Sequence, residues 1–178
     1  MKTIFAMAHG AKEKGPNPPL TLEGKAQNAS LQSALKEELK ALGLNFPSQT
    51  WIGGGLRFLD VAQALGLEPT HLSELVGTES SVERRQGEDE TQRLVLVLPD
   101  SREWPYDEKY ARSLRPSIVA LLASDEVENG AVFCTGREFI SALTGDLPWK
   151  IPTALYKIEV MDDGTVRALL VEKAAGKF

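Results

Sequence analysis

The stretch IFAMAHG, residues Ile4–Gly10, decides how this chain folds, because it is a short apolar run that ends in a histidine and a glycine. Such a run is typical of a buried β-strand. After a loop, leucines recur at helical spacing over residues 21–42, where Thr21 can cap the start of a helix. In open α/β sheets, ligands bind beyond the carboxyl ends of the strands. His9, one of only two histidines in the chain, is therefore a candidate functional residue.

Length, charge and cysteine content bound the class of protein. The 178 residues fit one ordinary domain, residues 1–178. The formal net charge of -5, without a long basic run, argues against nucleic acid as a partner. A single cysteine excludes an internal disulfide framework, and with only two histidines it argues against a metal site of the usual zinc type. No apolar run is long enough for a membrane span or a signal peptide, so we expect a cytoplasmic protein that does not engage membranes.

Short apolar runs alternate with amphipathic stretches along most of the chain. The expected strands are 3–8, 49–52, 94–98 and 131–134, and the expected helices are 21–42, 56–65, one from about 70, 107–124 and 135–143. Residues 77–92 are polar and carry charges of both signs, which predicts a solvated loop.

The end of the chain has a different pattern. Residues 154–160 and 165–171 are β-like runs that flank Asp162-Asp163-Gly164, a strong signal for a hairpin. Alternating strands and helices followed by a hairpin predict an α/β fold. We expect a three-layer α/β/α sandwich whose sheet is mostly parallel, with an antiparallel edge at the C-terminal hairpin.

Four of the expected strand ends would meet at one edge of a parallel sheet. They carry His9–Gly10, Gly53–Gly55, Asp100–Glu103 and Thr135–Gly136. Helix N-termini and backbone N–H groups point toward that edge, and glycines let a ligand approach the backbone. Lys12, in the loop after His9, would add positive charge. This combination suits an anion.

The opening of the chain resembles a known family. His9–Gly10 after a strand, followed by Pro19-Leu20-Thr21-x-x-Gly24-x-x-Gln27, is similar to the opening of the histidine phosphatase (phosphoglycerate mutase-like) superfamily. That opening is usually Arg-His-Gly and then Pro-Leu-Thr-x-x-Gly-x-x-Gln. Later segments resemble family landmarks in the same order: Gly53–Arg57, Leu98–Trp104, Val132–Gly136, Ile151–Thr153 and the hairpin around Asp163. The resemblance covers nearly the whole chain, and the length is similar to the compact phosphohistidine-phosphatase branch.

The resemblance implies a covalent histidine mechanism that uses no metal and no organic cofactor. It implies that His9 is the nucleophile and that Arg57 stands near the second phosphate-binding arginine of the family. It also implies an acidic residue that protonates the leaving group, for which Glu103 is preferred to Asp100.

Two positions depart from the family pattern. Ala8 stands where the family has its first arginine, and Thr135 stands where it has its second histidine. Arginine supplies a charged bidentate fork, alanine supplies no donor and threonine supplies one neutral hydroxyl. Losing one preorganised donor costs roughly a hundred- to a thousandfold in rate. The remaining phosphate-binding candidates are Gly10, Lys12, Arg57, Thr135 and Gly136.

We therefore expect a diverged, histidine-phosphatase-like protein. Its pocket around His9 would bind a small phosphorylated molecule or a phosphoprotein, with catalysis weakened or lost, as in a pseudophosphatase. Two alternatives stay open: an active phosphomonoesterase or phosphohistidine phosphatase with His9 as nucleophile, and a non-catalytic protein-interaction domain with a vestigial pocket. His71 is expected at the surface, and Cys134 is expected to be a buried core thiol.

Overall fold

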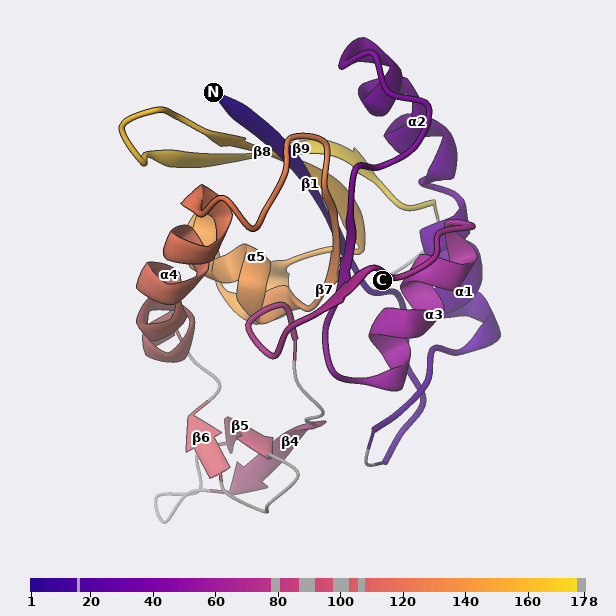
Figure 1. Ribbon diagram of the computed structural model, residues 1–178. Helices are drawn as coiled ribbons and strands as arrows, with labels where there is room; N and C mark the ends of the chain where they lie inside the picture. Colours follow the sequence, from indigo (N-terminus) through magenta and orange to yellow (C-terminus); the bar gives the residue numbers. More distant parts are fainter. Residues whose placement is uncertain (16, 78–80, 87–91, 98–102, 106–107, 176–178) are drawn as a thin grey trace.

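The computed structural model describes residues 1–15, 17–77, 81–86, 92–97, 103–105 and 108–175, and for 81–86, 92–97, 103–105 and 108–112 it describes the backbone alone. The described residues form one six-stranded sheet covered by helices, and a second, three-stranded sheet (Figure 1).

The main sheet is mostly parallel and has the strand order β3-β2-β7-β1-β8-β9. Its strands are β1 Lys2–Ala8, β2 Thr50–Ile52, β3 His71–Leu72, β7 Val132–Thr135, β8 Ala154–Val160 and β9 Val166–Lys173. The pairs β1–β7, β2–β7 and β2–β3 are parallel, whereas β1–β8 and β8–β9 are antiparallel. The α/β fold predicted from the sequence, with its antiparallel C-terminal edge, is confirmed.

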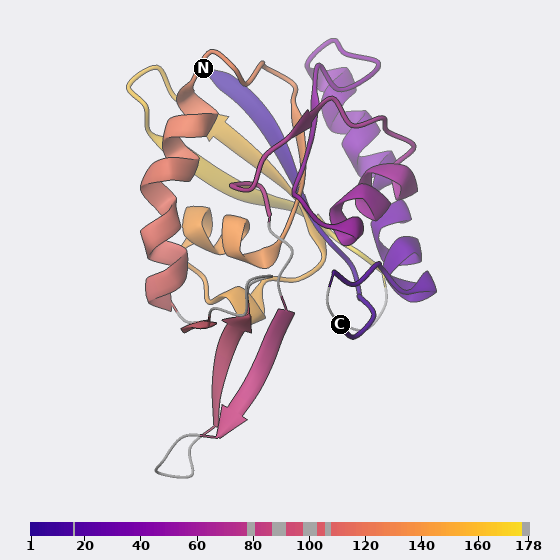
Figure 2. The same cartoon turned by 60° about the horizontal axis from the view of Figure 1, so that its bottom comes forward.

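Helices cover both faces of this sheet (Figures 1 and 2). They are α1 Leu22–Ala29, α2 Gln32–Ala41, α3 Leu56–Ala64, α4 Glu108–Ala123 and α5 Arg137–Thr144, with a short 3₁₀ turn at Pro148–Lys150. Side chains of β1 alternate between two apolar clusters: Ile4 and Ala6 pack with residues of α4 and α5, and Phe5 and Met7 pack with residues of α2 and α3. Because β1 is buried on both faces, its sequence is continuously apolar. In the described part of the chain, no helix combines the length and apolar character needed to cross a membrane.

The single helix expected over residues 21–42 is wrong, since the chain forms α1 and α2 with a break at Ser30 and Leu31. The Ser30 hydroxyl donates to the Gln27 carbonyl, and the Leu31 N–H donates to the Asn28 carbonyl at 3.1 Å. These tighter local bonds compete with the regular helical pattern. Thr21 caps α1 as predicted, because its Oγ accepts from the Gly24 N–H at 2.9 Å.

The helix expected from about residue 70 is also wrong. His71–Leu72 instead forms β3, parallel to β2 at the edge of the main sheet. The Thr70 N–H and hydroxyl both donate to the Thr50 carbonyl, and the His71 ring stacks on Trp51 with centroids 4.4 Å apart. These contacts hold the segment against β2. His71 is exposed, as expected.

Part of the polar segment 77–92 is a strand rather than a loop. Ser81–Gln86 forms β4, which pairs antiparallel with β5, Gln92–Val97, and β5 pairs with β6, Glu103–Pro105. Backbone N–H and C=O groups make this ladder whatever the polarity of the side chains, so composition alone misses it. The apolar strand expected at 94–98 therefore belongs to a separate sheet of order β4-β5-β6.

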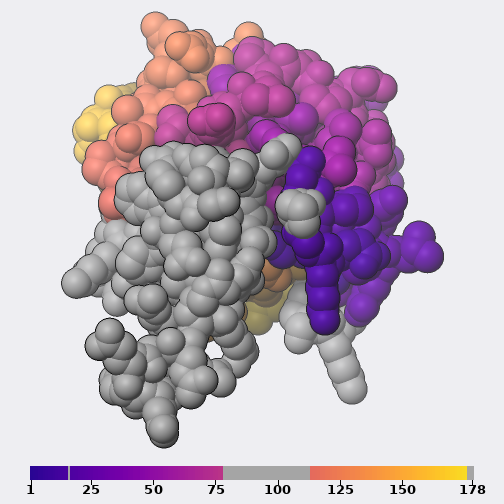
Figure 3. Space-filling model, turned by 90° about the horizontal axis from the view of Figure 1, so that it is seen from below, coloured from indigo at the N-terminus to yellow at the C-terminus, as the bar shows by residue number. Residues whose placement is uncertain are grey.

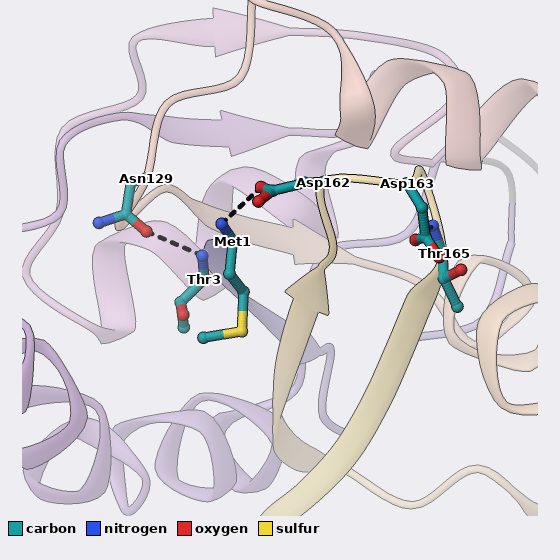
Figure 4. A network of polar contacts seen from close by, with 6 residues as sticks. All are labelled: Met1, Thr3, Asn129, Asp162, Asp163 and Thr165. Atoms are coloured by element: carbon teal, nitrogen blue, oxygen red, sulfur yellow. Dashed lines mark hydrogen bonds and ion pairs between the residues drawn. The ribbon is translucent and has the colours of Figure 1, made fainter.

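The predicted hairpin of β8 and β9 is present and is tied to the start of the chain (Figure 4). The amino group of Met1 lies 2.7 Å from the Asp162 carboxylate in the turn, and the Asp163 carboxylate accepts from the Thr165 N–H at 2.9 Å. Gly164 has a φ of 85°, which a glycine adopts without strain. These contacts stabilise the turn between β8 and β9 and connect it to the residue that precedes β1.

Candidate functional site

Three of the four strand ends expected at the rim come together. The strands β1, β7 and β2 are neighbours in that order, and Ala8 pairs with Thr135 at their carboxyl ends. The His9 N–H donates to the Thr135 carbonyl at 3.1 Å, which places the histidine directly beside the start of α5. Figure 3 views the molecule from this end, where the N-terminal segment, in indigo, reaches the surface.

The fourth expected strand, β5, belongs to the other sheet. Asp100 lies outside the described residues. Glu103 begins β6, for which the structure describes the backbone alone. Their roles as general acid therefore remain predictions.

The backbone fixes the tautomer of His9. Its Nδ1 lies 2.8 Å from the Gly10 carbonyl oxygen, and a carbonyl only accepts hydrogen bonds. Nδ1 therefore carries the proton, and Nε2 keeps its lone pair. The side chain is 95% buried, since its exposure is only 5%. His9 is thus a buried imidazole whose Nδ1 faces the Gly10 carbonyl.

Helix α1 holds the backbone around His9, which explains the pattern Thr21-x-x-Gly24-x-x-Gln27. Asn28 accepts from the Gly10 N–H at 2.7 Å and donates to the Ala8 carbonyl at 3.0 Å. Gln27 accepts from the Ala11 N–H at 2.9 Å. A side chain on Gly24 would collide with the Ala11 backbone. Because the Gly10 N–H is engaged by Asn28, we assign Gly10 a positioning role in this site.

Positive charge surrounds the buried histidine. Burial first, and then the charges of Arg137, Arg57 and Lys12, hold the pKa of His9 well below its usual range, against the opposing effect of the Gly10 carbonyl. Burial and the neighbouring Arg57 and Arg137 also lower the pKa of Lys12 to about 8, an effect that Glu138 opposes. The positive charges of Lys12, Arg57 and Arg137 therefore all act on the surroundings of His9.

Arg57 lies in the first turn of α3 and is buried, with 4% exposure. Its guanidinium carbon lies 4.4 Å from the centre of the Phe58 ring, and Phe58 meets His9 edge-on at a centroid distance of 6.0 Å. Arg57, which the sequence singled out, is therefore brought to the histidine together with its neighbour Phe58.

The glycines before α3 serve Phe58 rather than a ligand. A Cβ on Gly53 would lie 2.7 Å from the Phe58 ring, and one on Gly77 would collide with it. A Cβ on Gly55 would come within 3.3 Å of the same ring. The expectation that the run Gly53–Gly55 leaves room for an anion is therefore replaced by a packing role for Gly53 and Gly55, whereas a Cβ on Gly54 would meet only the Gly77 carbonyl oxygen at 3.9 Å.

The start of α5 contributes two charged residues that the sequence reasoning missed, Arg137 and Glu138. Arg137 is the first residue of α5, and its Nε donates to the Ile151 carbonyl at 2.9 Å. Gly136 precedes it as the N-cap. The Thr135 hydroxyl donates to the Val76 carbonyl, so its proton is not directed at a ligand. The sequence signal that could have indicated Arg137 and Glu138 is a pair of charged residues directly after a glycine at the end of a strand.

Cys134 is a buried core thiol, as expected, and burial raises its pKa to about 12. Such a thiol is almost entirely protonated near neutral pH and is a poor nucleophile. Among the residues that the structure describes, no group of three or more histidine, cysteine or acidic side chains is placed to hold a metal ion.

Comparison with solved structures identifies the fold. A phosphoserine phosphatase from Entamoeba histolytica matches with a TM-score of 0.55 at 14% identity, covering 99% of this chain and 98% of that chain. The chain shares the fold of this solved phosphatase. A mycobacterial glucosyl-3-phosphoglycerate phosphatase complexed with VO3 matches at 0.56 and 14% identity, covering 98% of this chain and 100% of that one. The product of open reading frame Rv3214 from Mycobacterium tuberculosis matches at 0.59 and 13% identity, covering 97% of each chain.

No protein-family model and no curated protein sequence matches this chain. At 12–17% identity, the structural matches establish the shared fold and leave the chemistry to the residues of this chain.

Proposed function

We propose that this protein binds phosphomonoesters in the pocket around His9 and hydrolyses them slowly through a phosphohistidine. The observation that carries the proposal is the neutral His9, whose Nε2 keeps its lone pair, set among Lys12, Arg57 and Arg137. Arginine and lysine are the usual partners of phosphate oxygens, and a neutral imidazole is the form that attacks phosphorus.

The reaction would proceed in two displacements. Nε2 of His9 attacks phosphorus, the P–N bond forms, and the P–O bond to the leaving group breaks as its oxygen takes up a proton. Water then attacks phosphorus, gives up a proton and releases inorganic phosphate, while the bonding pair returns to Nε2. Both transition states carry negative charge on the equatorial oxygens, which the three cations would stabilise.

Two features support slow turnover. Ala8 is fully buried and packs in the apolar cluster with α4 and α5, so it supplies no charge to the pocket. The Thr135 hydroxyl is committed to the Val76 carbonyl. If Arg137 replaces only one of the two missing donors, the remaining loss corresponds to a rate roughly a hundred- to a thousandfold below that of a complete site.

The chemistry of the substrate is that of a small phosphate ester. The structural neighbours include a phosphatase complexed with 3-phosphoglyceric acid and one for glucosyl-3-phosphoglycerate, so alkyl phosphates of this type belong in the first substrate panel.

The test compares hydrolysis of 4-nitrophenyl phosphate by the wild-type chain, by His9→Ala and by His71→Ala, from about pH 5 to about pH 8. His71 is exposed and lies on the edge strand β3, so it controls for loss of a histidine outside the pocket. We expect slow activity that survives in His71→Ala and disappears in His9→Ala.

Binding of vanadate, followed by calorimetry, separates the remaining outcomes. Vanadate bound without any hydrolysis would overturn the catalytic part of the proposal and leave a phosphate-binding pseudophosphatase. A chain that neither binds vanadate nor hydrolyses the ester would refute the proposal and favour a protein-interaction domain.

A further inference from the structure

The carboxylate of Glu138 lies at the start of α5, beside Gly136, and its charge acts on Lys12. Its Oε2 lies 2.7 Å from the position that a Cβ on Gly136 would take, so the carboxylate folds back over that glycine. Gly136 directly follows Thr135, whose carbonyl accepts from the His9 N–H. A larger residue at position 136 would displace the carboxylate from this place.

Two further observations relate this carboxylate to Phe58 and Lys12, which both lie near His9. Cε1 of Phe58 lies 3.7 Å from the same Cβ position of Gly136, and the Phe58 ring is the one that meets His9 edge-on. The negative charge of Glu138 also acts on Lys12, in the loop that follows His9. Glu138 is partly buried near the start of α5, which is anchored through the bond from Arg137 to the Ile151 carbonyl.

The proposed reaction needs a group that gives a proton to the leaving oxygen and later takes one from water. Arg57 and Arg137 keep their protons under all working conditions and serve only as charges. His9 is occupied as the nucleophile. A carboxyl group close to the nucleophile is the usual carrier of such a proton in hydrolases.

We propose that Glu138 is the catalytic acid and base of this site. This inference rests on the proposed phosphatase function. In the first displacement the protonated form of Glu138 gives its proton to the oxygen of the breaking P–O bond, so that a neutral alcohol leaves and Glu138 becomes the carboxylate. In the second displacement the carboxylate takes a proton from the attacking water as the P–N bond to His9 breaks. The proton and the charge on Glu138 are then restored, and no other reactant is consumed.

The dependence on the leaving group tests this role. An alkoxide is a poor leaving group that needs a proton, whereas nitrophenolate leaves readily without one. We expect Glu138→Gln to lower kcat for an alkyl phosphate such as phosphoserine by roughly a hundredfold to ten-thousandfold and kcat for 4-nitrophenyl phosphate by less than about threefold. Vanadate affinity serves as the check on folding and on the anion site, and it should not decrease. Glu37→Gln, an exposed residue of α2, is the matched control.

Each of the following outcomes would overturn the proposed role of Glu138. Equal losses on both esters would show that Glu138 has a structural role, and a lower KM on both esters with unchanged kcat would show that it only competes with the substrate for the cations. If Glu103→Gln or Asp100→Asn produced the selective loss and Glu138→Gln did not, Glu138 would not be the acid. All of these overturn the role of Glu138 while wild-type activity, dependent on His9, keeps the proposed function. A wild-type chain inactive on both esters would overturn the two together.

Discussion

Replacing Asn28 by alanine should destabilise the protein strongly, because this one side chain satisfies two buried backbone groups beside His9. Asn28 has no exposed surface. It accepts from the Gly10 N–H at 2.7 Å and donates to the Ala8 carbonyl at 3.0 Å. A buried polar group left without a partner costs about 1–3 kcal/mol. Two such groups give a loss of about 2–6 kcal/mol, less a few tenths for the better helix propensity of alanine.

Urea denaturation of the wild type, Asn28→Ala and Asn45→Ala measures this loss. Asn45 is exposed in the loop after α2, so its removal should change the free energy of unfolding by less than about 0.5 kcal/mol. For a domain of this size, a loss of about 3 kcal/mol lowers Tm by about 6–12 °C. A loss below about 1 kcal/mol for Asn28→Ala, at an unchanged m-value, would refute the view that these two bonds hold the segment around His9.

Two further predictions concern the charges of the pocket. Arg137→Leu should lower vanadate affinity by roughly ten- to a hundredfold, since hydrogen bonds to charged groups contribute about 1.5–3 kcal/mol. Calorimetry measures this affinity, and Arg167→Leu, a substitution on the distant strand β9, is the control. A change below about threefold for Arg137→Leu would contradict the assignment of Arg137 to the phosphate site. The pKa of His9 in the folded protein lies well below the ordinary 6.5, so the unfolded chain binds the proton first as pH falls. The free energy of unfolding of the wild type should therefore be highest above about pH 6.5 and decrease below it. In His9→Gln the decrease should be smaller, because the contribution of His9 is absent. If the free energy of unfolding fell equally with pH in the two proteins between about pH 7.5 and pH 5, the prediction would be contradicted.

Local sequence patterns predicted most of the fold because the decisive elements are buried or locally encoded. The apolar run of β1 and the turn at Asp162-Asp163-Gly164 each carry their own signal. The break at Ser30 and the strand at His71 depend on hydrogen bonds made only after the chain has folded. The β4 ladder depends on pairing with β5, which side-chain polarity does not encode.

Part of the candidate site could also be predicted from the sequence. Strand ends and motif spacing pointed to His9, Lys12 and Arg57, which the fold brings together. Arg137 and Glu138 were missed, because a charged pair after a strand-end glycine marks the position but does not tell which side chains of the first helical turn face a neighbouring strand. The sequence therefore indicated His9 and part of the positive charge around it, and the three-dimensional structure was needed for the rest; the role of His9 as nucleophile stays a prediction.

The packing of Phe58 against Gly53 and Gly77 has a consequence for how this protein can change over evolutionary time. A Cβ on Gly77 would collide with the ring, whereas a Cβ on Gly53 would also meet the backbone of Gly77. An alanine at Gly77 should therefore occur in a related sequence only together with a smaller side chain at the position of Phe58. Since the same ring touches His9, such a paired exchange would also reshape the wall of the pocket, so the size of residue 58 sets how wide a substrate a descendant of this protein could accept.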